Sequence, residues 1–280
     1  MRLTVSPGRC PRWTLRLRAF RGRWLSRVTR YTLETEAVAR VEDMQRIIGH
    51  RRVNASSDRF YTSLMDTREH WESVYRAKAP DKVSWFRAHL DRSLGLIERA
   101  VDQRSASIID VGGGESTLVD DLIERGFRNV TILDISETAI QVIKQRLGEA
   151  SALVQWVCAD VTRVNLPEQA YDVWHDRAVF HFLTNQEQRL AYIRNVASAV
   201  RPGGHVIVST FGPEGPKKCS GLDVVRYNAT TLHHEFGARF RLVESSQELH
   251  ETPFGTTQQF LYCYCVVERG QGSEAPGRNV

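Results

Sequence analysis

The sequence of 280 residues lacks any run of about 18 consecutive apolar residues, the length that a membrane-spanning helix needs. We therefore expect no membrane span. It has only five cysteines, an odd number at irregular spacings, which argues against a disulfide framework. No Cys-x-x-Cys pair occurs, so a structural zinc site is disfavoured and we expect no metal. Together these absences favour a reducing, cytoplasmic location.

The first thirty residues lack lysine and acidic side chains but contain nine arginines. Because all 33 acidic residues follow them, the net charge of +5 comes from this segment and the rest is mildly acidic. Such a segment is typical of a basic arm for nucleic acid or anionic membranes, of an organelle transit segment, or of an extension preceding a true start at Met65. We favour the last. We expect residues 1–64 to be a basic N-terminal extension, disordered or dispensable, and we do not expect a nucleic-acid partner.

From residue 65 onward, apolar runs alternate with amphipathic segments. The runs predict strands at 107–112, 130–134, 153–160, 171–176, 205–211, 240–249 and 258–267. Helical periodicity occurs around Trp71 and at 83–100, 116–125, 137–147, 186–200 and 230–236. This alternation predicts an α/β fold with a mostly parallel sheet and helices on both faces. We expect a single domain over 65–270 and a disordered tail at 271–280. The last two strands, joined by a Pro-Gly turn, should pair antiparallel at one edge.

A glycine-rich turn and three carboxylates mark the ends of the first three predicted strands. The first strand runs into Asp110-Val-Gly-Gly-Gly, in which Gly112 and Gly114 allow a ligand to approach the backbone. Asp134 ends the second strand, where it can accept hydrogen bonds from ribose hydroxyls, and Asp160 ends the third, where it can accept from an adenine amino group. Each aspartate alone could be a helix cap or turn residue, but together they predict a nucleoside site.

The charge of this loop indicates which nucleoside fits. It carries Glu115 and no lysine, unlike a loop that binds triphosphates. Thr117 stands where the dinucleotide fingerprint has its third glycine, which disfavours that class of site. A cationic nucleoside such as S-adenosylmethionine suits these acidic surroundings.

The ordered motifs around Asp110, Asp134, Asp160, Tyr171-Asp-Val-Trp-His-Asp and Arg201-Pro-Gly-Gly resemble the class I S-adenosylmethionine-dependent methyltransferases. The resemblance covers about residues 105–268. It implies a Rossmann-like sheet of seven strands, the last antiparallel, and S-adenosyl-L-methionine as cofactor. It also implies an extended set of cofactor-binding residues: Trp71, Tyr75, Asp110, Gly112, Gly114, Asp134, Ile135, Asp160, Val161, His175 and Arg177.

Within this class, the segment Trp71-Glu-Ser-Val-Tyr75 followed by Trp85-Phe86 resembles the lysine methyltransferases that act on elongation factor 1A and citrate synthase. That resemblance implies that Trp71 and Tyr75 cover the methionine end of the cofactor, although they could instead be core anchors. The chain departs from the group after its fourth strand. Asp176-Arg177-Ala-Val-Phe-His-Phe stands where that group has a Glu-Lys-Gly-Thr-Leu-Asp type of segment. Asp176 and Arg177 fit its first pair by charge, but residues 178–182 do not match, which leaves the methyl acceptor open.

Methyl transfer from a sulfonium is an in-line displacement, so the protein mainly positions the nucleophile. A base helps when the acceptor arrives protonated, and we expect His181 and Asp176 as the catalytic candidates. The expected function is methyl transfer to a protein side chain or a small molecule, by a monomer or weak dimer. An NAD-dependent or nucleotide-sugar oxidoreductase is disfavoured by the glycine spacing. A catalytically silent scaffold that binds S-adenosylmethionine in the same fold is the alternative.

Overall fold

The computed structural model describes residues 67–269, and the predicted extension and tail lie outside this range. Their boundaries therefore stay predictions. Residues 67–77 are helical. The strands of the main sheet are β1 (Ser107–Val111), β2 (Asn129–Asp134), β3 (Val154–Cys158), β4 (Tyr171–Arg177), β5 (Val200–Phe211), β8 (Phe240–Glu251) and β9 (Thr257–Val267). The helices around it are α3 (Asp91–Ala100), α4 (Leu118–Glu124), α5 (Glu137–Leu147), α6 (Gln186–Ala199) and α7 (Ala229–Phe236).

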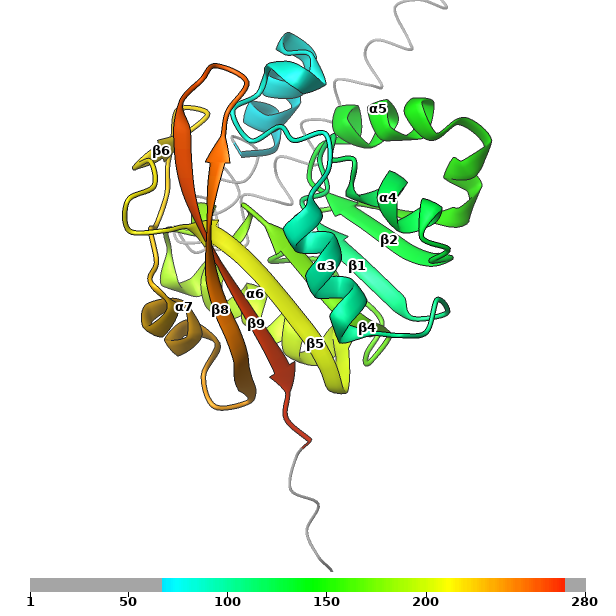
Figure 1. Cartoon of the computed structure of the whole chain (residues 1–280), viewed down its shortest axis with the longest axis vertical. Coiled ribbons are helices and arrows are strands. Elements are labelled where there is room, and N and C mark those ends of the chain that lie inside the picture. The colour runs from blue at the N-terminus through cyan, green and yellow to red at the C-terminus, as the bar shows by residue number, and fades with distance from the viewer. Residues whose placement is uncertain (1–66, 270–280) are drawn as a thin grey trace, which may run out of the picture. The chain divides into compact units, whose positions relative to one another are not determined.

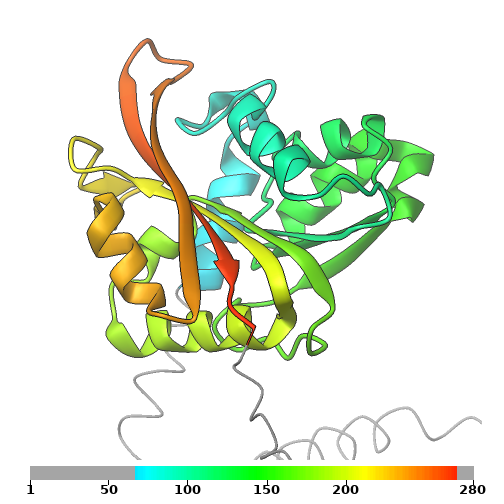
Figure 2. The same cartoon turned by 60° about the horizontal axis from the view of Figure 1, so that its bottom comes forward.

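The seven strands form one sheet in the order β3-β2-β1-β4-β5-β9-β8 (Figure 1). The pairs from β3 to β5 are parallel, whereas β9 lies antiparallel between β5 and β8. The predicted seven-stranded sheet with an antiparallel last strand is thus confirmed. Figure 2 shows the tip of the β8–β9 hairpin extending beyond the other strands.

Side chains of the sheet alternate between two apolar cores. Ile108 and Val173 point into the core that α3 and α4 cover, while Ile109 and Trp174 point into the core that α6 and α7 cover. Figure 1 shows α3 in front of the sheet and α6 behind it. Strands that are buried on both faces need continuous apolar runs, and these runs made it possible to predict the strands from the sequence. The order of the strands brings the carboxyl ends of β1 to β4 to the same edge.

The ends of α5 follow from its sequence. The Ser136 hydroxyl accepts a hydrogen bond from the Ala139 amide, and Gly148 ends the helix with a φ of 55°. A serine cap satisfies a free amide of the first turn, and glycine adopts positive φ at little cost. The loop from β2 therefore turns sharply into α5 next to Asp134.

The predicted helix over 83–100 is wrong in its first half, because α3 begins only at Asp91. The preceding segment contains a short 3-10 turn, Pro80–Lys82, and then an extended Val83 with a φ of −111°. Trp85 in this segment packs edge-on against Trp71, with 6.0 Å between the ring centroids. Tertiary packing of the aromatic side chains thus prevails over helical periodicity.

A small ribbon of β6 (Lys218–Cys219) and β7 (Leu222–Asp223) follows β5 and was not predicted. Within residues 67–269, no helix is long and apolar enough to cross a membrane.

Candidate functional site

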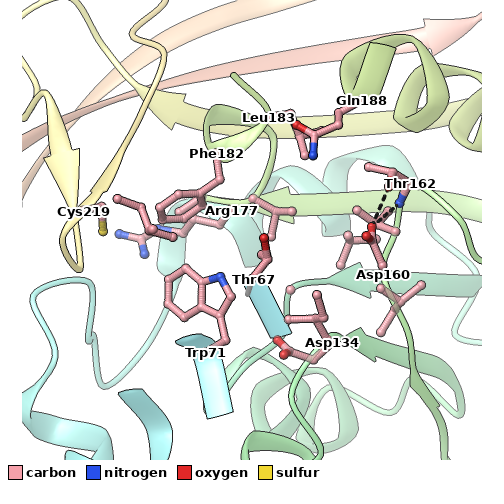
Figure 3. A pocket seen from close by; sticks show the side chains of 18 of the residues that line it. Thr67, Trp71, Asp134, Asp160, Thr162, Arg177, Phe182, Leu183, Gln188 and Cys219 are labelled. Atoms are coloured by element: carbon pink, nitrogen blue, oxygen red, sulfur yellow. Dashed lines mark hydrogen bonds between the residues drawn. The ribbon is translucent and has the colours of Figure 1, made fainter. Parts of the chain in front are cut away.

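A cavity of about 370 Å³ lies at the carboxyl ends of β1 to β4, where ligands bind in open parallel sheets. The helix at 67–77 and the β6–β7 ribbon also contribute to its wall. Figure 3 shows Asp134, Asp160 and Thr162 at one end of the cavity, and Phe182, Arg177 and Cys219 at the other, with Trp71 nearby. A smaller cavity of about 50 Å³ lies behind the glycine loop and shares Tyr75, Gly112 and Arg177 with the larger one.

The glycine loop has the backbone that its sequence predicts. Gly112 and Gly114 have φ angles of 65° and 52°, a region that side chains disfavour. A Cβ atom at position 112 would collide with Cγ2 of Val179, and one at position 114 would lie 2.5 Å from the Tyr75 hydroxyl. The loop therefore provides a cradle that only glycine permits.

Asp134 lies at the end of β2 and is buried, with 4% of the residue exposed. Its Oδ2 accepts a hydrogen bond of 2.8 Å from the Gly114 amide, and its Oδ1 accepts one of 2.8 Å from the Ser136 amide. Burial raises the pKa of Asp134 to about 6, although both amide bonds favour the charged form. Each oxygen keeps a second lone pair, so the carboxylate can still accept from two neighbouring hydroxyls.

Asp160 follows β3 and lines the larger cavity. Thr162 donates both its amide and its hydroxyl to Oδ1 of Asp160, at 2.8 Å and 2.7 Å. These bonds fix the side chain and leave Oδ2 available to accept from a ligand amino group. Ile135 and Val161 line the same end of the cavity and supply apolar walls for a flat ring.

Asp110 and His175 form a buried pair behind the glycine loop, in the lining of the smaller cavity. Oδ1 of Asp110 lies 2.7 Å from Nδ1 of His175, and Nε2 of His175 lies 2.8 Å from the Ser93 hydroxyl. The ring is therefore held at both nitrogens, and its contact with Asp110 fixes the orientation of that carboxylate.

Aromatic side chains form the wall opposite the strand ends. The ring of Trp71 lies 5.9 Å from Tyr75 and 5.1 Å from Phe182, measured between centroids. The helix that carries Trp71 is anchored by Glu72, whose carboxylate accepts hydrogen bonds from the Glu137 amide at 2.7 Å and from the Thr138 hydroxyl. This anchor joins the aromatic wall to the start of α5, beside Asp134.

The two catalytic candidates do not line either cavity. Asp176 is fully buried and accepts hydrogen bonds from the Val179 and Phe180 amides and from the Tyr192 hydroxyl at 2.8, 3.0 and 2.6 Å. Burial raises its pKa to about 6.

His181 is also fully buried, and its Nδ1 accepts a hydrogen bond of 3.1 Å from the Phe211 amide. Burial lowers the pKa of His181 to about 3, so the ring is neutral. The catalytic roles of Asp176 and His181 stay predictions, and this geometry favours structural roles for both.

Some residues of the cavity wall were missed from the sequence. Phe182, Gln188, Cys219, Leu222 and Asp223 all line the larger cavity. The last three belong to the β6–β7 ribbon, whose turn has Ser220 and Gly221 at φ angles of 48° and 83°. The Ser-Gly pair signals a turn, but nothing local indicates that this turn lies beside the nucleoside site. Among residues 67–269, no group of three His, Cys, Asp or Glu side chains could hold a metal ion.

Comparisons with known proteins agree with this fold. Residues 108–204 match the family model described as a methyltransferase domain. The eEF1A lysine and N-terminal methyltransferase of Danio rerio is 23% identical over 222 residues, 75% of this chain and 31% of that protein. The EEF1A lysine methyltransferase 2 of Homo sapiens is 22% identical over 167 residues, 55% of this chain and 71% of that protein. This chain spans 31% and 17% of the length of the first two curated relatives.

Solved structures show the same fold. The 1,6-didemethyltoxoflavin-N1-methyltransferase of Burkholderia thailandensis, solved with 1,6-didemethyltoxoflavin and S-adenosylhomocysteine, superposes with a TM-score of 0.60 at 19% identity. The superposition covers 75% of this chain and 90% of that one. A [4+2]-cyclase also superposes, with a TM-score of 0.54 at 15% identity over 69% of this chain and 86% of that one.

Residues 108–204 thus match a methyltransferase domain, and the sheet has the fold of class I S-adenosylmethionine-dependent methyltransferases, whose cofactor is S-adenosyl-L-methionine. Within the class, the resemblance to the elongation-factor-1A lysine methyltransferases is confirmed by the curated relatives.

Proposed function

We propose that this protein transfers a methyl group from S-adenosyl-L-methionine to a protein side chain or a small-molecule acceptor. The observation that carries this proposal is the convergence of Asp110, Asp134 and Asp160 with the glycine loop around two adjoining cavities. Cavities of about 300–1,000 Å³ are typical of small-ligand sites, and the larger one has this size. The cofactor supplies a methyl group that its sulfonium already activates.

The residues fit this cofactor in order along the cavities. Oδ2 of Asp160 would accept from the adenine amino group, and Asp134 would accept from the ribose hydroxyls. The amide-lined glycine loop and the Asp110 carboxylate would hold the methionine end, with His175 orienting that carboxylate. Trp71 and Tyr75 would face the sulfonium, because an aromatic face attracts a cation.

The end of the larger cavity away from Asp134 and Asp160 is the proposed place for the acceptor. Phe182 and Cys219 line it on the side away from Asp134 and Asp160 (Figure 3), and Leu222 of the β6–β7 ribbon also lines the cavity. The curated relatives are named as lysine methyltransferases of a protein, which supports a protein acceptor. The departure at residues 178–182 keeps a small-molecule acceptor within the proposal. A cytoplasmic location and a monomeric or weakly dimeric state belong to the proposal as well.

A scaffold that binds S-adenosylmethionine without transferring its methyl group is the second candidate. Two observations support this second candidate. Neither His181 nor Asp176 reaches the cavity, and a [4+2]-cyclase shares the fold, so fold alone does not establish the reaction.

A tritiated-methyl transfer assay separates the two functions. The protein is incubated with labelled cofactor and with cell lysate divided into protein, RNA and small-molecule fractions. Label transferred to one fraction by wild type but not by Asp134→Asn supports the enzyme. The matched control is Asp81→Asn, an exposed aspartate paired with Lys82, which should transfer as wild type does. Cofactor binding without transfer to any fraction would support the scaffold instead.

A further inference from the structure

A chain of buried hydrogen bonds leads from β9 to the glycine loop. The Tyr262 hydroxyl of β9 lies 3.1 Å from the Ser93 hydroxyl of α3, which in turn lies 2.8 Å from Nε2 of His175. Nδ1 of His175 lies 2.7 Å from Oδ1 of Asp110. None of the four residues is more than 3% exposed. Asp110 and His175 line the smaller cavity, whereas Ser93 and Tyr262 line neither cavity.

The number of hydrogens in this chain assigns the direction of each bond. An ionised carboxylate only accepts, so Nδ1 of His175 carries a hydrogen and donates to Asp110. The Ser93 hydroxyl has one hydrogen, which can point either to Nε2 of His175 or to the Tyr262 oxygen. The first arrangement fits a neutral ring and the second a charged ring. The direction of the Ser93 hydroxyl is therefore coupled to the charge of His175.

The Tyr262 hydroxyl favours the neutral ring. Its hydrogen-bond contact within residues 67–269 is with Ser93. If Tyr262 donates to Ser93, the Ser93 hydrogen goes to Nε2 of His175, and every hydrogen of the chain has an acceptor. If His175 were charged, the Tyr262 hydrogen would have no acceptor in the chain, and a buried donor without a partner is costly.

Charges on three segments act on the same ring. Asp110 of β1 favours a charged His175 because opposite charges attract. Burial of His175 disfavours the charged ring. Arg177 of β4 and Arg87, which precedes α3, line the same cavity and also disfavour a second positive charge, although both lie beside Glu248. The hydrogen bond from Ser93 therefore acts together with burial against the attraction of Asp110.

The charge of His175 determines the charge that Asp110 presents to the smaller cavity. With a neutral ring the pair is negative, whereas a charged ring would cancel the carboxylate. Glu115 is the other acid that lines this cavity, and burial raises its pKa to about 7, so it is only partly ionised at neutral pH. A cationic group in this cavity thus depends mainly on the charge of Asp110.

We propose that Ser93 is a positioning residue for the cofactor: its hydroxyl donates to His175, keeps the ring neutral, and so keeps Asp110 negative for the ammonium of the methionine end. This inference rests on the proposed function and gives a role to a residue that does not line either cavity. A purely structural Ser93 would affect stability, but it would affect neither the hydrogens on the ring nor the preference among ligands.

Nitrogen-15 NMR of histidine-labelled protein reads the ring directly, because ring nitrogens with and without a hydrogen resonate far apart. His175 is assigned as the signal that is missing from His175→Gln. Wild type at about pH 7.5 should show a neutral ring with its hydrogen on Nδ1. Ser93→Ala removes the donor to Nε2, so a larger fraction of the rings should carry hydrogen on both nitrogens. A charged wild-type ring, or the same ring state in both proteins, would overturn the inference.

Two ligands separate the charge of Asp110 from the rest of the site. S-adenosylhomocysteine carries the ammonium, whereas 5′-methylthioadenosine lacks the whole amino-acid part. Ser93→Ala should weaken S-adenosylhomocysteine at least about tenfold, roughly the loss of one charge-assisted hydrogen bond, and change 5′-methylthioadenosine by less than about threefold. Losses of equal size for the two ligands, or no loss for either, would make Ser93 a structural residue and contradict the proposed role.

The matched control removes a different buried hydroxyl from a histidine. Tyr264 lies on the same strand as Tyr262, and its hydroxyl lies 2.8 Å from Nδ1 of His205. Neither residue of this pair lines a cavity. Tyr264→Phe should therefore leave the His175 signal unchanged and keep both affinities within about threefold of wild type.

A second variant guards against an alanine protein that does not fold. Ser93→Cys keeps a weak donor of similar size, and its affinity for S-adenosylhomocysteine should lie between those of wild type and Ser93→Ala. A cysteine variant that binds this ligand as wild type does, with the same ring state, would overturn the inference even without the alanine variant. A wild type that fails to bind S-adenosylhomocysteine would count against the proposed function. Normal cofactor binding with a charged His175 would count against this inference alone.

Discussion

Replacing Asp134 by asparagine tests the nucleoside site with the smallest change of shape. The side chain keeps its size but loses the charge, and only one of its two terminal atoms can still accept a hydrogen bond. Because Gly114 and Ser136 each donate to a different carboxylate oxygen, one of these two amides must then face an amide nitrogen. The variant should therefore lose both ligand affinity and some stability of the loop.

The expected size of the effect follows from the charge-assisted hydrogen bonds. A charged acceptor contributes about 1.5–3 kcal/mol, so the dissociation constant for S-adenosylmethionine should rise roughly 10- to 150-fold. An unsatisfied buried amide costs about 1–3 kcal/mol of folding free energy. Isothermal titration calorimetry measures the first quantity and urea unfolding the second, with Asp81→Asn as the exposed control.

The pH dependence of binding gives an independent check. Because burial raises the pKa of Asp134 to about 6, the carboxylate is ionised at about pH 7.5 and mostly protonated at about pH 5. Wild-type affinity should fall across this interval, and Asp134→Asn should lack the part of the fall that is centred near pH 6. An asparagine variant that folds and binds the cofactor as tightly as wild type would refute the assignment.

Three further substitutions test the wall, the loop and the buried histidine. Trp71→Ala should weaken S-adenosylmethionine about 2- to 30-fold more than S-adenosylhomocysteine, because only the former has the cation; equal losses by calorimetry would make Trp71 a packing residue. Gly114→Ala places a Cβ 2.5 Å from the Tyr75 hydroxyl at a φ of 52°, so cofactor binding should fall at least about tenfold, and unchanged binding would contradict the cradle. His181→Gln, which can still accept from the Phe211 amide, should keep kcat within about tenfold of wild type, whereas a loss of about 100-fold or more would indicate a catalytic base. Because the pKa of His181 is about 3 when folded, wild type should lose stability as the pH falls from about 6.5, and urea unfolding of this variant should show a shallower loss.

The parts of the fold that were predictable are those that local chemistry determines. The bounds of α5 follow from Ser136 and Gly148, and both ends agree with the sequence prediction. The buried strands were readable because both of their faces contact apolar cores. The antiparallel hairpin of β8 and β9 followed from the turn between them.

The parts that were not predictable depend on contacts between distant segments. Residues 83–90 have helical periodicity, but they do not form a helix because Trp85 packs against Trp71 and lines the cavity instead. The β6–β7 ribbon is too short to have a periodicity, so the place of Cys219 in the wall had no sequence signal. His181 follows the fourth strand, as a catalytic residue could, yet its Nδ1 accepts a hydrogen bond from the Phe211 amide at the end of β5. In each case the sequence indicates the residue type, and only the tertiary structure indicates its neighbours.

The most direct test of the central claim is a crystal structure of the protein with S-adenosylhomocysteine. The account predicts that the adenine amino group lies within hydrogen-bond distance of Oδ2 of Asp160 and that the ribose hydroxyls lie within the same distance of Asp134. Ligand density in the larger cavity with these two contacts would support the cofactor site. Density elsewhere on the protein, or a nucleoside in the cavity that contacts neither aspartate, would contradict it.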